Sequence, residues 1–142
     1  MAEAKPTKSG FSVEERAAMR QRAQELKASA LREDGAKALA EAVRKLAGLD
    51  RKLAEKVVEL VEAAAPQLDP KTYYGFPAWA KDGKVVLFFK PASKFNSRYA
   101  KIEFDDAAGI DDGTMFACSY GLLDVTEANS NAITALVKKA LG

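Results

Sequence analysis

TYYGFPAWAKDGKVVLFFK, residues 72–90, is the stretch of the chain that decides the fold. Six aromatic residues in it surround a Gly-x-Pro element that could shape a groove. Aromatic side chains bury a large apolar area, so we expect this stretch to form the centre of a folded domain. Asp82-Gly83 between two β-prone runs predicts a hairpin. The continuously apolar residues 85–89 predict a strand that is covered on both faces or lies in mid-sheet.

Two more strands are expected downstream. Residues 99–104 alternate, so that Ala100, Ile102 and Phe104 share one face of a strand. Residues 115–120 are expected to form a further strand.

The sequence before this region predicts helices. Ser12 followed by Glu15 matches a capping box and predicts a helix over residues 13–31. Its apolar positions are mostly small, so we expect it to lie at the periphery. Gly35 is expected to break this pattern, and a second helix is expected over residues 36–47.

A third helix is predicted over residues 50–64, with Asp50 as its N-cap and Pro66 ending it. It has the strongest apolar face of the N-terminal half, so it should be the core helix. Thr126 is expected to cap a last helix. The apolar stripe of that helix is Ile133, Leu136, Val137 and Ala140.

These patterns predict an α+β fold, with an antiparallel sheet of four to five strands and helices packed on one face. We expect residues 1–11 to form a disordered tail and residues 12–35 a peripheral helix. Residues 36–142 are expected to form a single α+β domain.

Composition excludes several classes of function. The 142 residues include no histidine, the usual general base and a common metal ligand, and only one cysteine, Cys118. We expect Cys118 to be a small buried hydrophobe. The net charge of +2 gives no general reason to expect nucleic acid as a partner. No apolar run is long enough for a membrane span, and the N-terminus lacks a signal-peptide core, so we expect a cytoplasmic protein without a membrane partner.

The strand half resembles the YdhG-like family of small bacterial proteins, a group of unknown function. The residues that carry this resemblance are Tyr74-Gly75, Pro77-Ala78, residues 81–86 (KDGKVV), Lys94-Phe95, Arg98-Tyr99-Ala100, Asp111-Asp112-Gly113 and residues 133–140. The chain departs from the family pattern at Phe76, Phe116-Ala117 and Cys118. The resemblance implies an α+β fold, and one branch of the family is described as a frataxin-like iron chaperone that holds iron loosely. No iron-binding set is carried over from the family.

Acidic residues at the end of the strand expected over residues 99–104 and in the loop after it are a candidate metal site. Carboxylate oxygens suit hard cations and iron, and any binding through them should be weak. The alternative is that these residues cap and turn the chain. The candidate ligands are Glu103, Asp105, Asp106, Asp111 and Asp112.

Aromatic and basic residues form a second candidate site, a groove for a small ligand or a partner protein. Stacking of nucleic-acid bases is a weaker alternative, and the rings could equally be core. Lys101 is expected to pair with Glu103. The candidate groove residues are Tyr74, Pro77, Trp79, Lys84, Arg98 and Tyr99.

Two functional hypotheses are consistent with these residues. The first is a non-enzymatic cytoplasmic binding protein that carries iron weakly on its carboxylates. The second is a small-ligand or protein-interaction module that uses the aromatic groove. An enzyme ranks third, because no nucleophile elbow or phosphate-binding loop occurs. The helix over residues 13–31 could also pair with a second copy of the chain.

Overall fold

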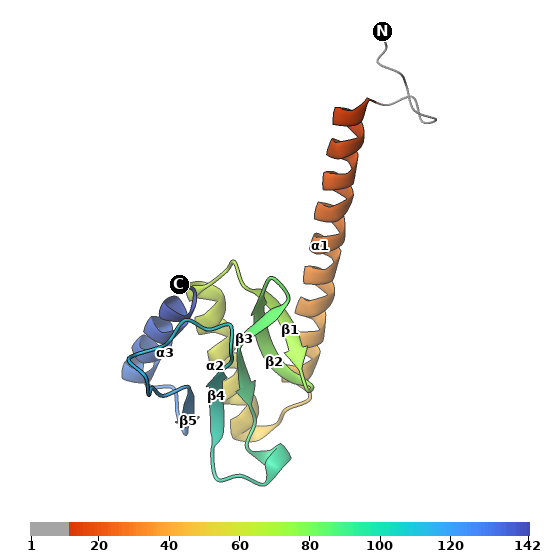
Figure 1. Cartoon of the computed structure of the whole chain (residues 1–142). Coiled ribbons are helices and arrows are strands. Elements are labelled where there is room, and N and C mark those ends of the chain that lie inside the picture. The colour runs from red at the N-terminus through yellow and green to blue at the C-terminus, as the bar shows by residue number, and fades with distance from the viewer. Residues whose placement is uncertain (1–11) are drawn as a thin grey trace. The chain divides into compact units, whose positions relative to one another are not determined.

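The computed structural model describes residues 12–142, which form an α+β fold. Figure 1 shows its helices and strands, and the chain divides between Glu33 and Asp34 into two compact units. The helices are α1 (Val13–Arg44), α2 (Gly48–Ala64) and α3 (Glu127–Ala140). The strands are β1 (Asp69–Tyr73), β2 (Phe76–Lys81), β3 (Lys84–Lys90), β4 (Ala100–Phe104) and β5 (Ser119–Leu122), and a short 3₁₀ helix, η1, spans Ser93–Phe95.

The five strands form one antiparallel sheet in the order β1-β2-β3-β4-β5, which is a simple meander. Asp82 and Gly83 both have positive φ and connect β2 to β3, so the expected hairpin is confirmed. Tyr74 and Gly75, also at positive φ, make a second two-residue turn between β1 and β2. Paired positive φ angles are typical of the tight turns that match the twist of a hairpin.

One face of the sheet packs on the helices and forms the core. The register places Trp79, Leu87 and Phe104 on this face, together with Phe89 and Ile102. All five are buried. Burial of aromatic and branched side chains on this scale dominates the stability of such a domain. The helical residues of the same core are Leu39 and Val43 of α1, Leu53, Ala54, Val57 and Val61 of α2, and Ile133, Val137 and Ala140 of α3.

The first helix differs from the expectation, because Gly35 does not break it. The structure has one continuous helix, α1, where two were predicted. A Cβ atom on Gly35 would lie 2.1 Å from the carbonyl oxygen of Pro70 in β1. Gly35 therefore lets the helix and the β1 backbone approach closely, a packing role that the spacing of apolar residues cannot reveal.

The capping box at the start of α1 is confirmed. The backbone N–H of Ser12 donates to Glu15 Oε1 at 2.8 Å, and the N–H of Glu15 donates to Ser12 Oγ at 3.1 Å. The α1 residues before the unit boundary carry exposed apolar side chains, among them Met19 and Leu26. The expected tail, residues 1–11, lies outside the described residues.

Two other boundaries differ from the expectation. Helix α2 begins at Gly48, and Asp50 is a buried residue inside it rather than its N-cap. Strand β5 begins only at Ser119, so residues 115–118 are not strand. Cys118 is exposed rather than buried. Thr126 does cap α3, where its Oγ1 accepts from the N–H of Asn129 at 3.1 Å.

None of the helices in residues 12–142 combines the length and the apolar character that a membrane crossing requires.

Candidate functional site

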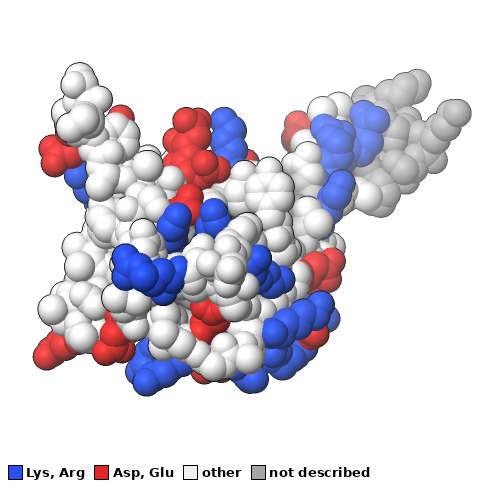
Figure 2. All heavy atoms as spheres, turned by 90° about the horizontal axis from the view of Figure 1, so that it is seen from below, with Lys and Arg blue, Asp and Glu red and all other residues white. Residues whose placement is uncertain are grey.

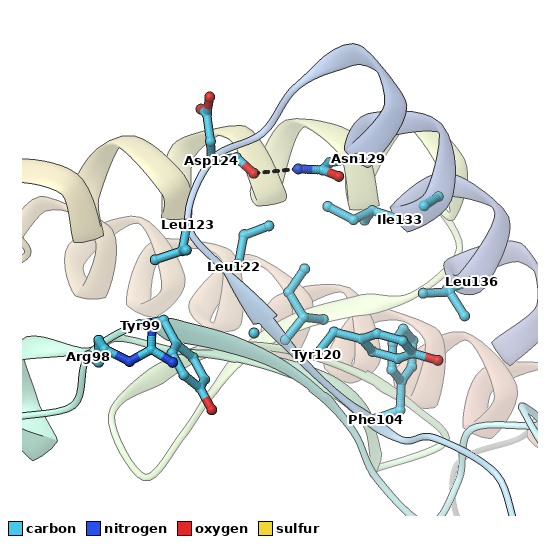
Figure 3. Close-up of a pocket in the computed structure, with 13 residues that line it drawn as sticks. Arg98, Tyr99, Phe104, Tyr120, Leu122, Leu123, Asp124, Asn129, Ile133 and Leu136 are labelled. Carbon is cyan, nitrogen blue, oxygen red and sulfur yellow. Dashed lines mark hydrogen bonds between the residues drawn. The ribbon is translucent and has the colours of Figure 1, made fainter.

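A hollow in the domain lies between the edge strand β5 and helix α3, and we call it the β5–α3 pocket. Its volume is about 530 Å³, within the usual range of small-molecule sites. Figure 3 shows Leu122, Ile133 and Leu136 pointing into it from the strand and the helix. The full lining is Arg98, Tyr99, Ile102, Phe104, Tyr120, Gly121, Leu122, Leu123, Asp124, Asn129, Ala132, Ile133 and Leu136.

Local sequence explains why the pocket exists. The residues Asn129, Ala132, Ile133 and Leu136 follow helical spacing and line the pocket from one side of α3. A neighbouring side of the same helix carries Val137 and Ala140 into the core. Helix α3 thus has two apolar sides, and only one of them is fully covered.

Hydrogen bonds hold the turn from β5 into α3 in place. The Asn129 side chain donates through Nδ2 to the carbonyl oxygen of Asp124 at 2.9 Å, which Figure 3 marks with a dashed line. The N–H of Val125 donates to Asp124 Oδ1 at 2.8 Å. With the Thr126 cap, these bonds fix the distance between the end of β5 and the start of α3.

Aromatic and basic residues stand at one end of the pocket. The Tyr99 ring lies against Gly121, where an added Cβ atom would be 2.9 Å from Tyr99 Cδ1. The Arg98 guanidinium lies 4.9 Å from the centroid of this ring, and Lys101 Nζ lies 5.9 Å from it. Both distances allow a cation–π attraction. Figure 3 shows Arg98 and Tyr99 on the side of the strand opposite to α3. We call Arg98, Tyr99 and Lys101 the cationic platform.

A buried carboxylate supports the loop that leads to the platform. Asp50 is 7% exposed and accepts hydrogen bonds from the N–H of Ala92 at 3.0 Å, the N–H of Ser93 at 3.0 Å and Ser93 Oγ at 2.5 Å. Burial raises the pKa of Asp50, but the bonds from Ser93 and Ala92 outweigh burial, and the pKa lies below its usual value. Helix α2 is therefore tied to η1, a few residues before Arg98.

The structure separates the six residues predicted to form one groove. Arg98 and Tyr99 line the β5–α3 pocket. Trp79, 1% exposed, and Pro77 are buried instead, and the Trp79 indole Nε1 has no hydrogen-bond partner within residues 12–142. Tyr74, 81% exposed, is in the β1–β2 turn, and Lys84 is exposed at the start of β3. The groove residues predicted within the stretch 72–90 therefore lie in the core, in a turn or at the start of β3, whereas only Arg98 and Tyr99 line the β5–α3 pocket.

The acidic residues are only partly gathered. Asp105, Asp106 and Asp111 line a smaller hollow of about 300 Å³. Glu103 is on the sheet face away from the helices, where its Oε2 lies 3.8 Å from Lys90 Nζ, and the expected pairing with Lys101 is replaced by this one. Asp112 is exposed and is not among the residues that line that hollow. Within residues 12–142 no three acidic, histidine or cysteine side chains are placed to hold a metal ion.

Sequence reasoning missed most of the pocket. The apolar stripe of α3 predicts Ile133 and Leu136 as core residues, and no pattern gives Leu122 or Leu123 a role. The one available signal is the width of the apolar stripe of α3, because Ala132 extends it beyond what a single buried face needs.

Charges are mixed on the face shown in Figure 2. Lys and Arg side chains form several separate groups there, with Asp and Glu side chains between them. Nucleic-acid binding surfaces usually carry a continuous basic patch, so this face offers little support for such a partner.

Comparison with known proteins found no matching protein-family model, no matching curated protein and no matching solved structure. The resemblance to the YdhG-like family therefore stays a prediction, and the geometry of the site is the firmer guide to function.

Proposed function

We propose that this chain is a binding domain that receives an apolar group in the β5–α3 pocket. The pocket itself is the observation that carries the proposal. Its walls are mostly aliphatic and aromatic side chains, and a few polar groups stand at its rim. Binding sites for organic ligands commonly have this composition.

The rim supplies groups that could orient the bound molecule. Arg98 offers a guanidinium, and its side chain contacts the Tyr99 ring. Asn129 and Asp124 already bond to each other, so the rim is largely organised before a ligand arrives. Preorganisation lowers the entropic cost of binding.

The alternatives have less support. An iron chaperone rests on the family resemblance alone, because the described carboxylates form no three-residue group suited to a metal. Pairing through the exposed apolar residues of α1 remains a separate proposal about assembly. A cytoplasmic setting is supported only by the single cysteine, which offers no internal disulfide.

A pocket-filling variant tests the proposal. The probe is 8-anilinonaphthalene-1-sulfonate, an apolar fluorophore with one anionic group. Ala132 is an exposed residue of the pocket lining, so Ala132→Trp should fill the space without disturbing the core. Ala135 is exposed on the same helix but outside the lining, so Ala135→Trp is the matched control. We expect saturable binding to the original chain and to the control, and a loss of about tenfold or more in Ala132→Trp. Equal binding to both variants would reject the pocket.

A further inference from the structure

We infer that the natural occupant of the β5–α3 pocket is an extended peptide segment that adds to β5 as a sixth strand. Its alternate apolar side chains enter the pocket, and the acidic side chains between them face the cationic platform. This inference rests on the proposed function and names the class of ligand.

The backbone of β5 has free hydrogen-bonding groups along its outer edge. The N–H of Phe104 donates to the carbonyl oxygen of Cys118 at 2.8 Å. Hydrogen-bonded pairs alternate along an antiparallel ladder, so with the observed register Tyr120 and Leu122 also bond toward β4. The N–H and C=O groups of Ser119 and Gly121 must then point away from the sheet. No hydrogen bond to these outward groups is found within residues 12–142.

The other edge of the sheet is protected. Strand β1 contains Pro70, which has no N–H to offer. Its carbonyl is also close to the α1 backbone at Gly35, where an added Cβ atom would lie 2.1 Å from the Pro70 oxygen. Strand β5 contains no proline and, within residues 12–142, has no such close contact with a helix backbone, and Ser119 and Gly121 are both exposed. An open edge with unpaired backbone groups is the usual site for strand addition.

The pocket lies where the side chains of an added strand would go. Residues directly opposite each other in a sheet share a face. A peptide residue opposite Tyr120 would therefore point to the helix side, where Leu136 and Ala132 line the pocket. In Figure 1, α3 lies on the β5 side of the sheet. The pocket therefore lies on the helix side of the sheet, beside the open edge of β5.

A second copy of the chain fits this space less well than a peptide. Pairing of β5 with its counterpart would bring a second α3 to the same face of the joined sheet. Each α3 borders the edge where the other chain would have to enter, so the two helices would compete for one space. A segment without its own helical layer avoids this conflict.

Charge sets the chemistry of the outward-facing peptide side chains. Peptide residues opposite Ser119 and Gly121 would lie on the face of the cationic platform. Gly121 has no side chain, so β5 places no side chain between such a residue and the cations of Arg98 and Lys101. The Tyr99 ring, which lies against Gly121, is the group between them. No carboxylate within residues 12–142 pairs with either cation. Glutamate or aspartate at alternate peptide positions complements this charge.

The test uses defined peptides, acetyl-Glu-X-Glu-X-Glu-X-amide with X as Val, Ile, Leu or Phe, each labelled with fluorescein and followed by fluorescence anisotropy. Ser119→Pro removes the outward N–H and leaves the hydrogen bonds to β4 in place, because the alternation of the ladder assigns those bonds to Cys118 and Tyr120. Ser119→Ala is the matched control. We expect at least one peptide to bind the original chain and Ser119→Ala equally, within about twofold. Ser119→Pro should weaken that binding by about tenfold or more, because it removes one bond and blocks close approach. Peptides with Lys in place of Glu should not bind.

The anilinonaphthalene probe separates this inference from the proposed function. Binding of the probe requires only the pocket, so Ser119→Pro should bind the probe with the same affinity as the original chain. Such binding also shows that the variant is folded. If the probe binds but no peptide of the set does, or if a peptide binds Ser119→Pro unchanged, the strand-addition inference is overturned and the pocket stands. If the probe fails to bind the original chain, the proposed function falls as well. Should Ser119→Pro not fold, amide exchange in the original chain decides, because the bound peptide must protect the N–H groups of Ser119 and Gly121.

Discussion

The carboxylate of Asp50 gives a prediction about stability with a defined sign and size. It accepts three hydrogen bonds from Ala92 and Ser93 while it is 7% exposed. In Asp50→Asn the amide oxygen can replace one carboxylate oxygen, but the amide NH₂ then faces a backbone N–H donor. At least one bond to a charged acceptor is lost, and such a bond contributes about 1.5–3 kcal/mol. We expect the free energy of unfolding at pH 7 to fall by about 2–3 kcal/mol.

The effect should depend on pH in a particular direction. The pKa of Asp50 is lowered in the folded state, so the carboxylate stabilises the fold fully above the unfolded-state pKa of about 3.9. That stabilisation is lost as the pH falls through the folded pKa. The difference between the original chain and Asp50→Asn should therefore be largest near neutral pH and shrink below about pH 4.

Urea unfolding followed by Trp79 fluorescence measures this difference at each pH. Asp112 is exposed in a loop, so Asp112→Asn is the control and should change stability by less than about 0.5 kcal/mol. If Asp50→Asn unfolds at the same urea concentration as the original chain at neutral pH, the argument fails. A difference that persists unchanged in acid would refute the role of the charge.

Close contacts and burial give three further predictions. Gly35→Ala should lower the free energy of unfolding by about 1–2 kcal/mol, because the overlap with the Pro70 oxygen outweighs the gain of about 1 kcal/mol in helix propensity; a more stable variant in urea unfolding would contradict the close approach. Gly121→Ala should cost about 1 kcal/mol in the original chain and much less in a Tyr99→Ala background, since the three atoms nearest to the added Cβ atom all belong to the Tyr99 ring; equal costs in the two backgrounds would be the opposite result. The fluorescence of Trp79 should be blue-shifted and resist quenching by acrylamide, because the side chain is 1% exposed; red-shifted, readily quenched emission would show that it lines an open groove.

Much of the fold could be predicted because local signals dominate it. The Asp82-Gly83 turn, the Ser12 and Thr126 caps and the alternation of Ala100, Ile102 and Phe104 each depend on residues close in sequence. Such signals need no knowledge of tertiary contacts. The α+β class with an antiparallel sheet followed from them.

The failures share a physical cause, which is contact between distant parts of the chain. Gly35 resembles a helix breaker until the backbone of Pro70 is placed beside it. Asp50 resembles an N-cap, but its partners are in the loop after β3, more than forty positions away. Side-chain and backbone bonds of this kind override local preference.

The candidate site was harder to predict for the same reason. Of the six expected groove residues, only Arg98 and Tyr99 line the pocket. Aromatic side chains such as Trp79 are suited to both a core and a groove, and the sequence does not say which face of a strand is covered. The pocket depends on how α3 packs beside β5, and no residue pattern records that packing.

Mapping the anilinonaphthalene probe on the ¹⁵N-labelled chain by NMR tests the central claim most directly. We expect the amide signals of Leu122, Leu123 and residues 129–136 to shift together, in a saturable way and with one affinity. Shifts that instead gather along α1 around Met19 and Leu26, with β5 and α3 unchanged, would contradict the claim that the β5–α3 pocket is the binding site.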